Sequence, residues 1–321
     1  MAPRIDPALP LVWRTPSDLQ LGATSARVVL HDAGELETGL ISALRHGASL
    51  DTLTTIGVGL GGSPERVRSV LAALAPAFEG SPAAGPQPTD HQESSVAGSE
   101  PASARRVAID ADGDLGARLA EGLRALGHGA VELGRGDADA DPGPGAAIDG
   151  ALADGVDLAV IGADWVVPPA RHLRWLRRDV PHLAVVFDDA GTRVGPLVEP
   201  GAGPCLRCLE LTRRDADAAW PVIAAQLAGR PASSRDARAV IGAVAIAVAV
   251  IDDRLAHDGR MLERATIRLD RVRPAGLPRR HRHAAHPECG CRAPGGTATV
   301  PVPLDARRPA TSSATAGAVP A

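Results

Sequence analysis

Short apolar runs and amphipathic segments alternate through the second half of the chain. The apolar runs have the length and composition of buried strands, and the segments between them carry apolar residues at helical spacing. The predicted elements, in chain order, are a strand at 107–109, a helix at 115–126, a strand at 130–133, a helix at 146–152, a strand at 158–161, a helix at 168–177 and a strand at 183–187. Strict alternation of this kind predicts an α/β unit with a parallel sheet covered by helices on both faces. Beyond it, the pattern predicts a strand at 192–198, two or three helices and a late strand at 266–269.

A second pattern occupies the first 80 residues. Three short strand candidates at 11–14, 19–21 and 27–30 precede helical patterns at 35–44, 49–56 and 63–78. The last helix begins with Ser63 and Pro64, which are an N-cap residue and a first-turn proline. Three strands and three helices at this size predict a small winged-helix-like α+β domain.

Composition sets the domain limits. Residues 81–104 and 293–321 are rich in Ser, Pro, Gly and Ala and poor in large apolar residues, so they cannot bury enough surface to offset chain entropy. We therefore expect a domain at 1–80, a flexible linker at 81–104, an α/β domain at 105–292 and a disordered tail at 293–321.

Charge and hydropathy narrow the class of protein. The net charge of −4 gives no general attraction to nucleic acid or to an anionic membrane. The most apolar stretch, 239–251, is too short to span a bilayer, and the N-terminus lacks the pattern of a signal peptide. We expect a cytoplasmic protein without a membrane or nucleic-acid partner.

The cysteines form two close pairs that are far apart in the sequence. Cys205 and Cys208 make one pair, Cys289 and Cys291 make the other, and the chain contains no further cysteine. Two thiolate pairs suit tetrahedral zinc, with every coordination position filled, so the zinc would be structural and not catalytic.

Alternative interpretations of the cysteine pattern are two disulfides or four free thiols without a function. A cytoplasmic chain disfavours disulfides, and a Cys-x-Cys disulfide is strained. His286, three residues before Cys289, is an alternative ligand, but a surface histidine is the simpler interpretation.

The residues around the first cysteine pair carry a family resemblance. The segment 193–208 (RVGPLVEPGAGPCLRC), with DADAAWP at 215–221 and HPECGC at 286–291, resembles the ThiF-like proteins of thiazole/oxazole-modified microcin clusters. The resemblance covers most of 105–292 and implies a Rossmann-like, mainly parallel sheet whose four cysteines hold zinc. The segments LVWR at 11–14 and LQLG at 19–22 are similar to a PqqD-like peptide-recognition domain.

The resemblance implies partners as well as a fold. Proteins of this type bind the leader of a precursor peptide, act with a YcaO-type partner enzyme and are commonly homodimers. Active relatives use ATP to adenylate a carboxylate or to activate an amide.

The expected nucleotide site is degenerate in this chain. Gly113 and Gly116 follow the first strand of the α/β unit, where a glycine-rich turn would present backbone N–H groups to phosphates. Aspartates at 110, 112 and 114 would repel a triphosphate, and the chain contains no lysine. Asp164 stands where a working relative would hold magnesium, although a solvated loop aspartate is the simpler interpretation. The sequence therefore weighs against adenylation and predicts no catalytic residue.

Three functions compete at this point. The first is a leader-peptide-binding scaffold in which an extended peptide joins the strand at 27–30 beside the helix at 63–78, as peptides add to open sheet edges. The second is an ATP-dependent adenylyltransferase or cyclodehydratase component. The third is a winged-helix DNA-binding regulator, which ranks last because residues 1–80 carry six arginines against eight acidic side chains. A basic run at 278–283 could contact nucleic acid or an acidic peptide, and a solvated connector is the simpler interpretation.

Overall fold

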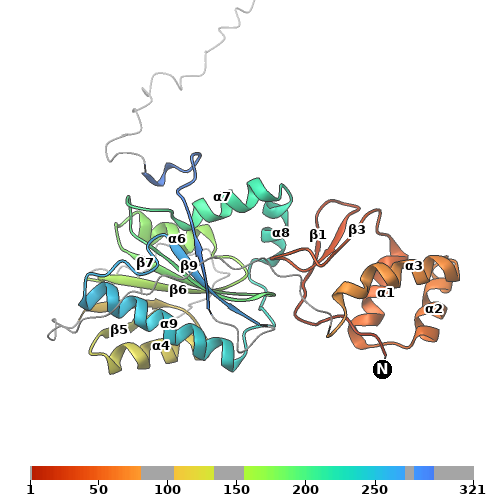
Figure 1. Ribbon diagram of the computed structural model, residues 1–321, viewed down its shortest axis with the longest axis horizontal. Helices are drawn as coiled ribbons and strands as arrows, with labels where there is room; N and C mark the ends of the chain where they lie inside the picture. Colours follow the sequence, from red (N-terminus) through yellow and green to blue (C-terminus); the bar gives the residue numbers. More distant parts are fainter. Residues whose placement is uncertain (1, 81–104, 134–154, 272–277, 293–321) are drawn as a thin grey trace, which may run out of the picture.

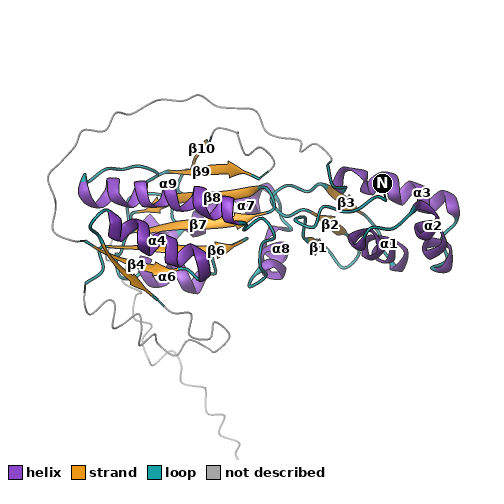
Figure 2. Cartoon of the chain, turned by 90° about the horizontal axis from the view of Figure 1, so that it is seen from below, coloured by secondary structure: helices purple, strands orange, loops and turns teal. Residues whose placement is uncertain are grey.

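The computed structural model describes residues 2–80, 105–133, 155–271 and 278–292. The helix predicted at 146–152, the linker at 81–104 and the tail at 293–321 lie outside these ranges. The described residues form an N-terminal unit beside a larger α/β unit (Figures 1 and 2).

The N-terminal unit pairs a small antiparallel sheet with three helices. The strands lie in the order β1-β2-β3, which leaves β1 and β3 at the two edges. The elements are β1 (Leu11–Trp13), β2 (Leu19–Leu21), β3 (Val28–Leu30), α1 (Glu35–His46), α2 (Leu50–Gly59), α3 (Pro64–Leu74) and the short 3-10 turn Ala75–Ala77. Ser63 accepts the backbone N–H of Arg66, which confirms the predicted cap, and Ser49 accepts that of Thr52 and caps α2 in the same way. All three predicted strands and all three predicted helices are confirmed, and the last helix tightens after Leu74.

The α/β unit is built on a seven-stranded sheet with the order β10-β9-β8-β7-β6-β4-β5. Its strands are β4 (Arg106–Asp110), β5 (Gly129–Glu132), β6 (Leu158–Asp164), β7 (His182–Asp188), β8 (Gly191–Val198), β9 (Ala265–Asp270) and β10 (Arg279–Arg282). The four strands β5-β4-β6-β7 are parallel, as the alternating pattern predicts.

The other side of the sheet adds antiparallel strands to the parallel part. Strands β8, β9 and β10 each run antiparallel to their neighbours. Only Asp189 and Ala190 separate β7 from β8, and a connection that short can join only antiparallel neighbours. Gly191 supports the tight reversal with a φ of 143°, and a Cβ there would lie 2.0 Å from the carbonyl oxygen of Leu269. The sheet is therefore mixed.

Helices cover both faces of the sheet, each over its own apolar core. On one face α4 (Gly113–Ala125) and α9 (Ala237–Ala256) cross, and Gly122 lets them approach, because a Cβ there would lie 2.9 Å from Val248. On the other face lie α6 (Pro169–Leu176) and α7 (Leu206–Ala216), and α8 (Trp220–Leu227) extends toward the N-terminal unit (Figure 1). No helix among the described residues is both long and apolar enough to cross a membrane.

The basic run at 278–283 is not a solvated connector. Residues 279–282 form β10, which pairs antiparallel with β9 at the edge of the sheet. Its polar sequence gave no strand pattern because an edge strand needs no buried apolar face.

Polar contacts join the two units. The side-chain amide of Gln226 in α8 pairs with the backbone of Trp13, accepting its N–H at 2.9 Å and donating to its carbonyl oxygen at 2.7 Å. Arg14 makes a bidentate pair with Asp217, at 2.7 and 2.8 Å. The amide of Gln226 thus acts as a strand partner and closes the free edge of β1.

Candidate metal centre and an arginine-filled crevice

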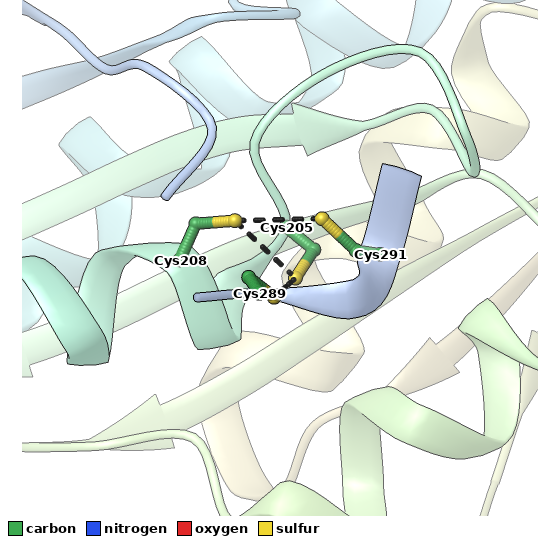
Figure 3. A group of neighbouring side chains, drawn as sticks. All are labelled: Cys205, Cys208, Cys289 and Cys291. Carbon is green, nitrogen blue, oxygen red and sulfur yellow. Dashed lines mark hydrogen bonds between the residues drawn. The ribbon is translucent and has the colours of Figure 1, made fainter. Parts of the chain in front are cut away.

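The four cysteine sulfurs meet at one point on the α6/α7 face of the sheet. Figure 3 shows the side chains converging from the start of α7 and from the C-terminal strap, by which we mean residues 283–292. All four Sγ atoms lie within 4.8 Å of one another. The S···S distances are 3.9 Å for Cys205–Cys208, 3.7 Å for Cys205–Cys289 and 3.4 Å for Cys208–Cys291.

These distances suit a tetrahedral ion and exclude a disulfide. Four sulfurs about 2.3 Å from a zinc ion would lie about 3.8 Å from one another. A disulfide would bring two sulfurs to about 2.05 Å, and all four cysteines are free. The donor set is therefore the one that zinc prefers in structural sites.

Local structure explains how each pair is presented. Cys205 is the N-cap of α7, and Cys208 donates its backbone N–H to the carbonyl oxygen of Cys205 at 3.0 Å, so both sulfurs project from one helical turn. In the strap, Cys289 donates its backbone N–H to the carbonyl oxygen of His286 at 3.0 Å, and a 3-10 turn at Gly290–Arg292 carries Cys291.

The surroundings of the thiols shift their pKa values in different directions. Burial raises the pKa of Cys205, and burial also raises the pKa of Cys291 to about 11. Burial opposes ionisation of Cys208 too, but the backbone groups of His286 and Cys205 and the neighbouring sulfurs outweigh it and lower the pKa of that thiol. Binding of a cation would therefore release protons from this cluster.

His286 is not the surface residue that the sequence suggested. It is 8% exposed, and its Nδ1 accepts the backbone N–H of Glu288 at 3.1 Å. Its Nε2 therefore carries the proton and donates to Asp215 at 2.8 Å. Arg214 adds a second link from α7 to the strap through Glu288, at 2.7 Å. These contacts hold the strap against α7 independently of the sulfurs.

The residues predicted for a nucleotide site gather at the carboxyl ends of β4 and β6, which we call the crevice. Gly113 begins α4 with a φ of 56°, and Gly116 must be small because a Cβ would lie 2.7 Å from the carbonyl oxygen of Ala111. Asp164 ends β6 with only 17% of its side chain exposed, so it is not a solvated loop residue.

Arginines pair with every aspartate of the crevice. Arg171 holds Asp110 through both carboxylate oxygens, at 3.0 and 2.7 Å. Arg235 donates to Asp112 at 2.9 Å and lies 3.7 Å from Asp164. Asp114 pairs with Arg118 at 2.8 Å. These arginines neutralise the aspartates of the crevice, and a shallow cavity of about 340 Å³ remains beside Asp112, Gly113 and Arg235.

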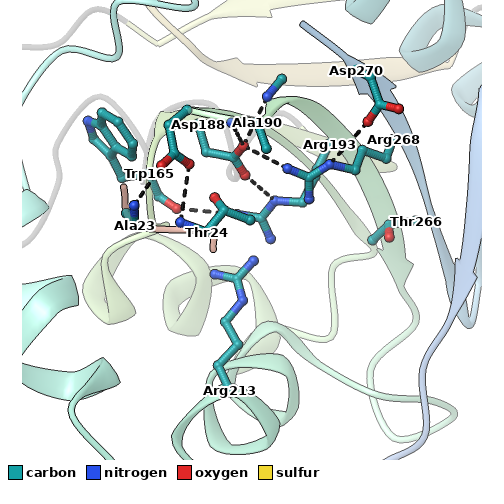
Figure 4. Close-up of polar contacts among 12 residues, drawn as sticks. Ala23, Thr24, Trp165, Asp188, Ala190, Arg193, Arg213, Thr266, Arg268 and Asp270 are labelled. Carbon is teal, nitrogen blue, oxygen red and sulfur yellow. Dashed lines mark hydrogen bonds and ion pairs between the residues drawn. The ribbon is translucent and has the colours of Figure 1, made fainter. Parts of the chain in front are cut away.

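A second polar cluster lies where the N-terminal unit meets the sheet (Figure 4). Asp188 accepts from Arg193 at 2.9 Å and from Arg268 at 3.0 Å, so its buried charge is neutralised. Asp189 accepts the backbone N–H groups of Ala23 and Thr24 at 2.6 and 3.1 Å. Burial and the neighbouring Asp188 raise the pKa of Asp189. Neither aspartate stood out in the sequence, because Arg268, Ala23 and Thr24 are distant from them along the chain.

Comparisons with known proteins give distant structural similarities. No protein-family model matches the chain, and no curated protein matches it. Among solved structures, a heterocyclase in complex with substrate and cofactor superposes with a TM-score of 0.42 and 16% identity, over 91% of this chain and 39% of that one. The heterocyclase TruD gives 0.40 and 16%, over 90% and 42%. E. coli MccB with the selenomethionine form of MccA gives 0.42 and 10%, over 91% and 100%. The chain spans about two fifths of the length of the two heterocyclases.

Proposed function

We propose that this chain is a zinc-stabilised, leader-peptide-binding scaffold of an azole-forming peptide-modification system. The N-terminal unit would capture a precursor peptide and present it to a partner enzyme of the YcaO type. The zinc ion would be structural, held by Cys205, Cys208, Cys289 and Cys291, and the chain would perform no ATP chemistry of its own.

The observation that carries the proposal is the asymmetry of the N-terminal sheet. The edge of β1 is closed by Gln226, whereas β3 ends the strand order within the described residues and lies beside α3. Val28 and Leu30 turn their side chains into the core, and Val29 is half-buried. An extended peptide can add to such an edge by main-chain hydrogen bonds. The resemblance of 11–14 and 19–22 to a peptide-recognition domain supports the same edge.

The crevice supports a scaffold over an adenylating enzyme. Asp112 and Asp164 share Arg235, so the two carboxylates that could hold magnesium already face an internal cation. A nucleotide would have to displace that guanidinium, which also lies 5.3 Å from the ring centroid of Phe187.

Hydrogen exchange of the full zinc-loaded chain tests the peptide site. Leaders of small precursor peptides encoded near the gene are the probes. We expect a bound leader to protect the amides of β3 and to leave those of β1 unchanged. Val29→Pro should weaken binding about tenfold or more by disrupting strand pairing, and Gln226→Ala serves as the control that leaves binding intact. Protection confined to the α/β unit would refute the proposal.

A further inference from the structure

Strand β10 and the cavity beside it form a second surface on which a polypeptide can dock. We propose that this surface binds an extended acidic segment of a partner protein, which adds as an eighth strand next to β10. The inference does not depend on capture of a leader peptide at β3, since it concerns a different sheet.

The backbone of β10 offers an open hydrogen-bonding edge. β10 is the terminal strand of the sheet within the described ranges. His283 donates its backbone N–H to the carbonyl oxygen of Arg264 at 2.8 Å, and the register pairs His281 with Thr266. Because bonded pairs alternate along an antiparallel ladder, the backbone groups of Arg280 and Arg282 point away from β9.

The same positions carry positive charge without a carboxylate partner. Arg280 and Arg282 make no ion pair with any described residue, and Arg264 donates only to the carbonyl oxygen of Ala202, at 3.3 Å. We call these three residues the arginine edge. Most other arginines near the sheet are paired, as Arg279 is with Asp270 at 3.5 Å. In a chain with a net charge of −4, the arginine edge is a local exception.

A cavity of about 360 Å³ opens beside the arginine edge. It is lined by Arg264, Arg282 and His283, by the loop 202–204 and by the alanines at 284 and 285. Its lining thus includes two arginines together with small apolar residues. A carboxylate side chain of an added strand could pair with an arginine there.

The C-terminal strap fixes this surface in place. β10 runs directly into the strap, and the cysteine cluster anchors the strap to α7. Thr266 and His283 add a side-chain hydrogen bond of 3.0 Å between β9 and the end of β10. A prearranged strand loses little conformational freedom when a partner strand pairs with it.

Charged edge strands also serve to prevent unwanted strand pairing. That role depends on repulsion between strands of the same charge, so it does not prevent pairing with an acidic strand. A nucleic acid would satisfy the guanidinium groups but could not use the alternating N–H and C=O groups of the open edge. The combination of backbone edge, unpaired arginines and cavity therefore favours an acidic polypeptide.

Fluorescence anisotropy with the full zinc-loaded chain tests the inference. The probe is a labelled peptide of about ten residues that alternates glutamate with threonine, a length typical of long strands, and the matched probe replaces each glutamate with glutamine. We expect binding of the glutamate probe that weakens with added salt, and binding of the glutamine probe that is at least tenfold weaker.

Variants separate charge from backbone pairing. Arg280→Glu with Arg282→Glu should lose the acidic probe and gain a matched lysine–threonine probe, while Arg68→Glu, an exposed arginine of α3, should change neither. Arg280→Pro should bind the acidic probe more weakly than Arg280→Ala, because only proline removes the outward N–H. Zinc content and melting temperature confirm that each variant is folded.

Two results would overturn the proposal. One is equal binding by Arg280→Pro and Arg280→Ala together with tighter binding of a single-stranded oligonucleotide, which would reduce the surface to a polyanion patch. The other is no binding of the acidic probe to the folded wild-type chain at low salt.

Discussion

The cysteine cluster and the crevice lie in the same unit, but they satisfy their charged groups in opposite ways. In the crevice, Arg171, Arg235 and Arg118 each pair with an aspartate. At the cysteine cluster, four sulfur atoms lie within 4.8 Å of one another, and the side-chain contacts of these sulfurs among the described residues are with one another. A site whose charges are paired with one another does not require a charged ligand. Four sulfur donors that converge on one point indicate a site for a metal ion. The difference indicates that the cysteine cluster can hold a metal ion and that the charges of the crevice are already balanced by the protein.

The largest expected effect comes from breaking the cysteine cluster. Cys208→Ser should abolish zinc binding and lower the free energy of unfolding by about 5 kcal/mol, because a structural metal site contributes directly to folding. Chemical denaturation with metal analysis measures both. Thr212→Val, on the same helix, is the control, since the Thr212 hydroxyl contacts only the carbonyl oxygen of Cys208. A Cys208→Ser variant as stable as wild type would show that the cluster is not structural.

Lowering the pH should lower the stability of the fold through two buried histidines on the cysteine side of the sheet. Burial lowers the pKa of His172 to about 4, and burial lowers the pKa of His182 to about 4. Since these pKa values lie below those of the unfolded chain, the unfolded state gains protons first as pH falls below about 6.5, and stability falls until about pH 4.

Each histidine should cost about 2 kcal/mol of stability at pH 5 relative to pH 7. Urea unfolding at the two pH values measures the loss, and His172→Gln should lose about 2 kcal/mol less than wild type. An unchanged pH dependence in that variant would refute a buried neutral histidine. Comparison of the two zinc-loaded proteins removes the contribution of the thiols, which both share.

The contact between the two units should weaken when Asp189 is replaced. Asp189→Ala leaves the buried N–H of Ala23 and that of Thr24 without an acceptor, which should cost about 1–3 kcal/mol. Hydrogen exchange should show faster exchange at those two amides with the crevice unchanged. A uniform change across the whole chain would instead indicate general unfolding.

The smallest expected effect comes from opening the crevice. Arg235→Ala should lower stability by about 1 kcal/mol, since Asp112 and Asp164 lose their shared cation. Magnesium should then raise the melting temperature of the variant but not that of wild type. If magnesium and ATP stabilise the wild-type chain instead, the crevice is a working nucleotide site.

Local patterns predicted much of this fold, and distant contacts account for what they missed. The strands β4, β6 and β7 were predictable because parallel strands buried on both faces are apolar throughout. The cysteine cluster was predictable because each pair is close in sequence. Strand β10 was not, since an edge strand has no obligatory apolar pattern.

The pairing of the crevice was also hidden from the sequence. Arg235 lies 123 residues from Asp112, so no local spacing relates them. The role of His286 depends on Asp215, 71 residues away, in the same manner. Ion pairs between remote segments become visible only once the topology places their residues together.

X-ray absorption at the zinc edge, on protein purified under reducing conditions, tests the central contrast most directly. We expect one zinc ion per chain with four sulfur neighbours at about 2.3 Å and no nitrogen or oxygen ligand. Absence of zinc, or a ligand shell with fewer than four sulfurs, would contradict a metal centre that locks the strap onto α7.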